Sequence, residues 1–100
     1  MTKAMRNELR TLFNDSQVAQ VAITKNGTVL IGADFDRYGL CESGVYELTP
    51  TLDVEPLRLF KKSPRVWNRN IYLRKIARRI GATLIESAEK MAAYLERETA

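Results

Sequence analysis

Apolar residues recur with a helical spacing in two parts of the chain. Near the N-terminus the stripe predicts an amphipathic helix over residues 2–14, with Met5, Leu9, Leu12 and Phe13 on one side. A second stripe predicts one long helix over residues 71–96, which Gly81 interrupts. That stripe consists of Leu73, Ile76, Ile80, Leu84, Ala88, Met91 and Leu95.

Between these helices the pattern changes to the alternation that is typical of strands. Residues 18–25 and 28–33 are predicted strands, and the Asn26-Gly27 dipeptide between them suits a two-residue type I′ turn. A second hairpin is predicted from strands at 35–41 and 45–49 around a turn at 42–44. Residues 53–62 are predicted to form a short helix, with Pro56 in its first turn and with Leu57 and Phe60 facing the core.

This order of elements predicts an α+β fold in a single domain of residues 1–100. The expected arrangement is an N-terminal helix, an antiparallel meander of three to four strands, and then a short helix and a long C-terminal helix. The helices are expected to pack on one face of the sheet. A composition of 45% hydrophobic and 28% charged residues is that of an ordinary globular domain.

Charge is strongly segregated along the chain. Between Glu55 and Glu86 there are nine Lys/Arg and no acid, whereas residues 34–55 hold six acids and only one base, Arg37. The formal net charge of +4 hides this separation, which a polyanion or an acidic protein would experience as a local field. On one long helix, bases in the N-terminal half and acids in the C-terminal half would also oppose the helix dipole.

Residues 61–79 are the candidate site that this charge pattern predicts. Their bases are interleaved with aromatic and amide side chains, a mixture that neutralises phosphates and stacks on exposed bases. The predicted nucleic-acid-binding residues are Lys61, Lys62, Arg65, Trp67, Arg69, Arg74, Lys75, Arg78 and Arg79. Two other interpretations stay open: the bases pair with the acidic residues of the meander or form a solvated helix face, or they contact an acidic protein surface.

Other chemistry has little support in the sequence. The chain has no histidine and a single cysteine, so it offers no Cys/His zinc site and no histidine-dependent catalytic arrangement. The pair Asp34 and Asp36 is more typical of turn-forming residues than of a metal or catalytic site, and Cys41 has the acidic neighbour Glu42. We therefore expect no enzyme activity, no cofactor, no metal and no small-molecule substrate.

The bulk properties also predict where the protein acts. The longest apolar runs are too short to span a bilayer, and no apolar segment of a signal peptide follows the N-terminus. One cysteine cannot form an intrachain disulfide. These features predict a cytoplasmic protein without membrane contact.

The predicted long helix would exceed the size of its domain. Its 26 residues would extend about 39 Å, whereas a compact domain of this length is about 30–35 Å across. An overhanging end would expose Met91, Tyr94 and Leu95, which are the predicted partner-binding residues of a homodimer contact or a partner groove. Packing of the same residues under the N-terminal helix is equally expected.

Two classes of function fit these observations. In the first, the chain is a small non-enzymatic regulatory or accessory protein that contacts nucleic acid or a nucleoprotein through residues 61–79. In the second, it is a protein-binding adaptor or inhibitor, for example an accessory protein of a mobile genetic element, and has no nucleic-acid contact.

Overall fold

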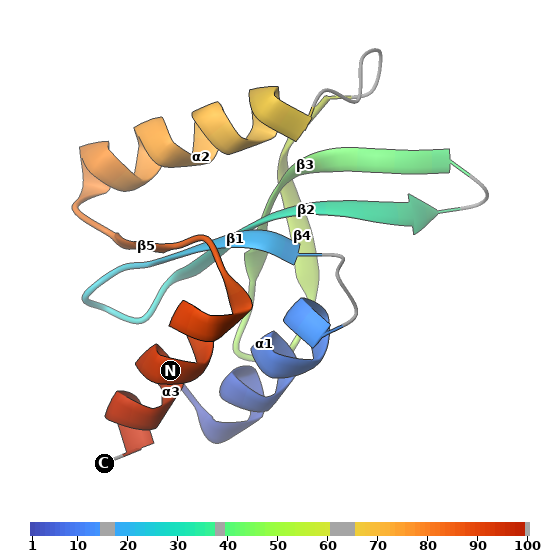
Figure 1. The fold of residues 1–100 in the computed structure, drawn as a ribbon. Coiled ribbons are helices and arrows are strands. Elements are labelled where there is room, and N and C mark those ends of the chain that lie inside the picture. The colour runs from blue at the N-terminus through green and yellow to red at the C-terminus, as the bar shows by residue number, and fades with distance from the viewer. Residues whose placement is uncertain (15–17, 38–39, 61–65, 100) are drawn as a thin grey trace.

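The computed structural model describes residues 1–14, 18–37, 40–60 and 66–99, with side chains at 1–13, 18–34, 43–60 and 69–97. A five-stranded antiparallel sheet in the order β4-β3-β2-β1-β5 is combined with three helices (Figure 1). The α+β fold is therefore confirmed, with five strands instead of the expected three to four. The elements are α1 (Lys3–Asn14), β1 (Val18–Ile23), β2 (Val29–Arg37), β3 (Leu40–Leu48), β4 (Val54–Leu59), α2 (Val66–Ile80), β5 (Thr83–Ile85) and α3 (Ala88–Thr99).

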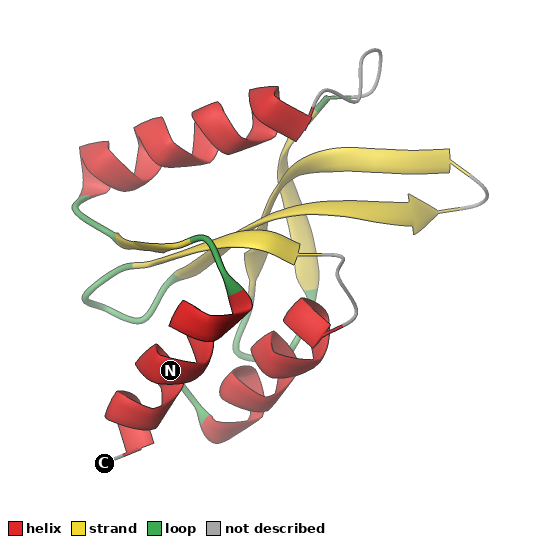
Figure 2. Ribbon diagram, in the orientation of Figure 1, coloured by secondary structure: helices red, strands yellow, loops and turns green. Residues whose placement is uncertain are grey.

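The apolar residues form two cores, one on each face of the sheet. On β2, Val29, Ile31 and Ala33 face α1 and α3, whereas Leu30 faces α2 with Leu73 and Ala77. This alternation follows from the two-residue period of a strand. The helices therefore cover both faces (Figure 2), and the expectation that they share one face is wrong.

The N-terminal helix and the first hairpin form where the sequence predicts them. Thr2 caps α1, because its Oγ1 accepts a hydrogen bond of 3.1 Å from the backbone N–H of Met5. The first hairpin turns at Asn26-Gly27 but is not a type I′ turn, since only Gly27 has a positive φ, of 87°. The Gly27 N–H donates to the Thr24 carbonyl at 3.1 Å, which makes a three-residue loop with the glycine in the left-handed position.

The connection between β3 and β4 repeats this turn with a different residue. Leu52 donates its N–H to the Thr49 carbonyl at 2.9 Å and has a φ of 67°. Thr49 in turn donates its N–H to the Asp53 carbonyl at 2.9 Å. Leu52 therefore stands in the position that Gly27 takes in the first turn, where a side chain is unfavourable.

The predicted long helix is instead two helices with a strand between them. Gly81 has a φ of 68°, and the Ala82 N–H donates to the Ala77 carbonyl at 2.9 Å, so α2 ends in a Schellman motif. The chain then forms β5, which pairs with β1, before Ser87 begins α3 by accepting a hydrogen bond from the Lys90 N–H at 3.1 Å. The overhanging helix end expected from the sequence does not exist.

Two further predictions about the sheet are wrong. Residues 54–59 form the edge strand β4 and not a helix, and Leu57 is 52% exposed instead of facing the core. Ser43 and Gly44 lie within β3, opposite Asp34 and Ala33, and do not form the predicted turn. Among the helices that the structure describes, none has the length and apolar character needed to cross a membrane.

Candidate nucleic-acid interface

Helix α2 lies across the sheet with one narrow stripe buried. Arg69, Leu73 and Ala77 occupy every fourth position and face the strands, with Tyr72 and Ile76 half-buried beside them. Most of the remaining side chains from Ile71 to Ile80 are exposed. The helix therefore shows a broad face to the solvent (Figure 1).

This outer face is strongly basic. Arg74, Lys75, Arg78 and Arg79 are exposed, and α2 contains no acidic residue. Arg78 and Arg79 lie in the last turn of α2, where the helix dipole favours positive charge. The unfavourable charge order expected from one long helix is thus absent, because Gly81 ends the helix directly after the bases. We call Arg74, Lys75, Arg78 and Arg79 the α2 basic face.

Only one residue of the α2 basic face has an ionic partner within the described part of the chain. The Arg74 Nη2 lies 2.6 Å from Oε2 of Glu86, and the hydrogen bonds from this guanidinium lower the pKa of the Glu86 carboxyl below its ordinary value. The same hydrogen bonds raise the pKa of Arg74. Within the described residues Lys75, Arg78 and Arg79 form no salt bridge, so their charges stay available to an external anion.

The acidic meander does not neutralise these bases where the structure describes it. Glu47 and Glu55 lie directly opposite each other on β3 and β4. Neither carboxylate forms a salt bridge with a described residue. Within the described residues, Glu47 and Glu55 therefore do not neutralise the α2 basic face.

Arg69 is the exception, and its predicted role in binding nucleic acid is wrong. It is 1% exposed under α2, and its Nη1 lies 2.5 Å from Oδ1 of Asp34 on β2. A cation enclosed in this way cannot reach a phosphate. Asp34 is correspondingly a partner of Arg69 and not a turn former.

The layer between α2 and the sheet contains other polar groups. Gln20 and Ser43 are each 1% exposed, and Nε2 of Gln20 donates to Oε2 of Glu86 at 3.0 Å. A carboxylate at the end of β5 is thereby held by Gln20 from β1 and by Arg74 from α2. This contact fixes α2 relative to the strands beneath it.

One cation that belongs to this surface was not among the predicted site residues. Arg58 on β4 is exposed, and its guanidinium carbon lies 5.6 Å from the ring centre of Phe60 and 6.0 Å from that of Tyr72. The two rings meet edge to face at 5.9 Å. The acid-free stretch after Glu55 includes Arg58, but an expected helix there gave no reason to place it beside Tyr72.

Lys61, Lys62 and Arg65 lie outside the described residues, as does the side chain of Trp67. The interface therefore rests on the C-terminal two-thirds of α2.

The predicted partner-binding residues belong mainly to the protein's own core. Met91 is 1% exposed and Leu95 0% exposed, and both pack in the same core as Leu9 and Phe13 of α1. Tyr94 is half-buried against that core. The structure thus bears out packing under the N-terminal helix and contradicts an exposed patch that contains Met91 and Leu95.

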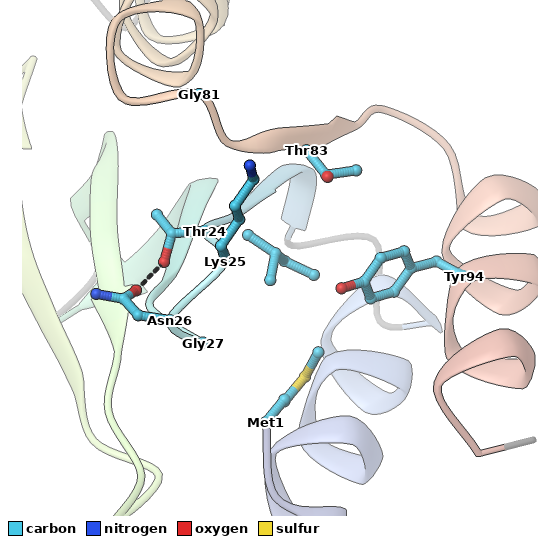
Figure 3. Close-up of a pocket in the computed structure, with 9 residues that line it drawn as sticks. Met1, Thr24, Lys25, Asn26, Gly27, Gly81, Thr83 and Tyr94 are labelled. Carbon is cyan, nitrogen blue, oxygen red and sulfur yellow. Dashed lines mark hydrogen bonds between the residues drawn. The ribbon is translucent and has the colours of Figure 1, made fainter.

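A pocket of about 520 Å³ lies at the end of the sheet beyond the C-terminus of α2. In Figure 3 the side chains of Thr83 and Tyr94 lie across from Thr24 and Lys25 of the first hairpin turn. Its lining consists of Met1, Ile23, Thr24, Lys25, Asn26, Gly27, Gly81, Thr83 and Tyr94. Lys25 is the charged side chain of this lining, so the pocket continues the positive character of α2 at this end.

Comparisons with protein-family models, with curated proteins and with solved structures found no match for this chain.

Proposed function

We propose that the chain is a small, non-enzymatic regulatory or accessory protein that binds nucleic acid through the α2 basic face. The observation that supports this most is an exposed helix face of four bases, three of which have no ionic partner among the described residues. Such bases release condensed counterions when they meet phosphates, which supplies most of the free energy of sequence-independent binding.

The same geometry supports contact with phosphates more than with bases. Tyr72 and Phe60 contact each other, and Arg58 lies near both rings, so these aromatic side chains are engaged within the protein. Direct reading of sequence would require amide or arginine side chains fixed against base edges. We infer similar affinity for unrelated sequences, and a cytoplasmic location consistent with the single cysteine.

Two double variants with equal charge changes test the proposal. Lys75→Gln with Arg78→Gln removes two bases of the α2 basic face. Lys3→Gln with Arg10→Gln removes one exposed lysine and one exposed arginine from α1 on the opposite face of the sheet. Fluorescence anisotropy with labelled single- and double-stranded DNA and RNA measures the affinity of each.

The α2 variant should bind at least about tenfold more weakly than the native protein at low salt, and the α1 variant within about twofold of it. Equal losses of affinity in the two variants would mean that binding depends on the net charge of the protein and not on the α2 basic face. That result would contradict the proposal.

A further inference from the structure

Strand β5 is an open edge of the sheet. In the order β4-β3-β2-β1-β5 it is the last strand, and its three residues pair with β1 on one side only. An edge strand presents backbone N–H and C=O groups that another strand can pair with. The opposite edge, β4, contains Pro56, which removes a donor and makes that edge a poorer template.

A groove of about 540 Å³ runs beside this open edge. One wall is formed by Thr83, Leu84 and Ile85 of β5, and the other by α3. Figure 3 shows Thr83 on β5 and the Tyr94 ring projecting from α3, and both residues line this groove as well as the pocket at the first turn. A strand edge and a helix thus lie side by side with open space between them.

The sequence of α3 explains the shape of the groove. Lys90, Ala93, Tyr94 and Arg97 recur at intervals of three and four residues, which places them on one side of the helix. Met91 and Leu95 form a different stripe, which is buried in the core. Ala93 lies between Lys90 and Arg97 on this side of the helix, and its small side chain leaves room for a side chain of a bound partner.

We propose that this groove binds an extended, acidic peptide segment of another protein, which adds a strand to β5. Main-chain pairing with an exposed edge beside a helix is an established mode of peptide recognition, in which alternate side chains enter the groove. An apolar side chain would lie over Ala93, and carboxylates would approach Lys90 and Arg97, whose guanidinium carbon lies 5.9 Å from the ring centre of Tyr94. Glu96 is the single acid of the lining, so the groove carries a net positive charge.

A second copy of this chain is a poorer occupant. A twofold axis that joins two β5 edges would bring the Lys90 and Arg97 side chains of both copies to the same interface. Like charges at such a contact are destabilising. Nucleic acid is also a poorer fit, because a phosphate backbone would leave the apolar part of the lining without a partner.

The test uses labelled peptides and two variants of α3. The first peptide carries glutamate, valine and glutamate at every second position with threonine between them, so that these three side chains share one face. The second peptide has lysine in place of both glutamates. The third repeats the first with every backbone nitrogen methylated, so that it donates no backbone hydrogen bond. Ala93→Glu places a bulky acid inside the groove. Ala92→Glu makes the same change on the same helix at an exposed residue that does not line the groove.

Fluorescence anisotropy should show that the glutamate–valine peptide binds at least about tenfold more tightly than either other peptide, a difference of about 1.4 kcal/mol. Ala93→Glu should weaken its binding at least about tenfold, and Ala92→Glu by less than about twofold. Equal behaviour of the two variants, equal binding of the N-methylated peptide, or no binding at about 1 mM protein would overturn the proposal. Two further outcomes would also overturn the proposal. Self-association that Ala93→Glu abolishes would show that the groove binds a second copy of the chain, and displacement of the peptide by a single-stranded oligonucleotide would show that it binds nucleic acid.

Discussion

The Nη1 atom of Arg69 lies 2.5 Å from Oδ1 of Asp34, and this ion pair joins α2 to β2 beneath the α2 basic face. The Arg69 side chain is 2% exposed and that of Asp34 is 34% exposed. A buried cation is strongly unfavourable unless it is paired, so the contact constrains how α2 can lie on the sheet. The position of the exposed bases of α2 depends on this constraint.

Arg69→Ala is expected to lower the free energy of unfolding by about 3 kcal/mol, the lower end of the range for breaking a buried pair, because Asp34 keeps some contact with water. The control is Arg74→Ala, which removes an exposed ion pair and should lower the free energy of unfolding much less. Urea denaturation measures both. Similar losses in the two variants would mean that Arg69 does not stabilise the attachment of α2.

Glu86 makes part of the stability depend on pH. Arg74 lowers the pKa of this carboxyl in the folded protein from its ordinary value of 4.5. A group with a lowered pKa in the folded state stabilises the protein above its unfolded pKa, and that contribution is lost as the pH falls through the folded pKa. Glu86→Gln should therefore be less stable than the native protein at pH 7, and the difference should shrink below about pH 4.5.

Urea midpoints of the native protein and the Gln variant between neutral and acid pH check this prediction. A difference that stays constant across that range would show that the ionised carboxylate does not contribute.

Among the residues that the structure describes, Leu52 is the non-glycine residue with a positive φ. Its φ of 67° costs an L-residue about 1–2 kcal/mol, and the equivalent position of the first turn is Gly27. Leu52→Gly should raise the free energy of unfolding by up to about 1 kcal/mol, because the greater entropy of glycine in the unfolded chain offsets part of the gain. Thermal or urea unfolding measures the change.

Two reference variants separate backbone conformation from side-chain loss. Leu57→Gly removes another exposed leucine from an ordinary strand conformation and should destabilise the protein. Gly27→Leu places a side chain in the strained position and should cost about 1–2 kcal/mol. If Leu52→Gly destabilises as much as Leu57→Gly, the strain at Leu52 is unimportant.

The fold class could be predicted from local sequence signals, but the boundaries of several helices and strands could not. The apolar stripe of α1 and the Asn26-Gly27 turn are short-range patterns, and both elements form. The helical spacing of Ile80 and Leu84 continues past Gly81 by coincidence. Leu84 belongs to strand β5, where it and its neighbour Ile85 lie on opposite faces of the sheet. A strand of three residues is too short to produce a recognisable period, so β5 could be found only from its pairing with β1.

Strand β4 was missed for a related reason. Pro56 near the start of an apolar segment resembles the first turn of a helix, yet an edge strand also tolerates proline because its outward N–H has no partner. Tertiary pairing with β3 decided the outcome.

The candidate site was predicted in part. The exposed bases of α2 follow from the acid-free stretch of the sequence. The burial of Arg69 depends on Asp34, which lies 35 positions earlier in the chain and reaches it only through the fold. The groove beside β5 requires the break at Gly81, so its residues could not be grouped while 71–96 was taken as one helix.

The salt dependence of nucleic-acid affinity is the most direct test of the central claim, that the α2 basic face binds phosphates. For three to four phosphate contacts, the logarithm of the affinity should fall with the logarithm of salt concentration with a slope of about −2 to −4. Lys75→Gln with Arg78→Gln should reduce the magnitude of this slope by about 1.4–1.8, and Lys3→Gln with Arg10→Gln should leave it unchanged. A slope near zero, an unchanged slope in the α2 variant, or no binding to any DNA or RNA at about 50 mM salt would contradict the account.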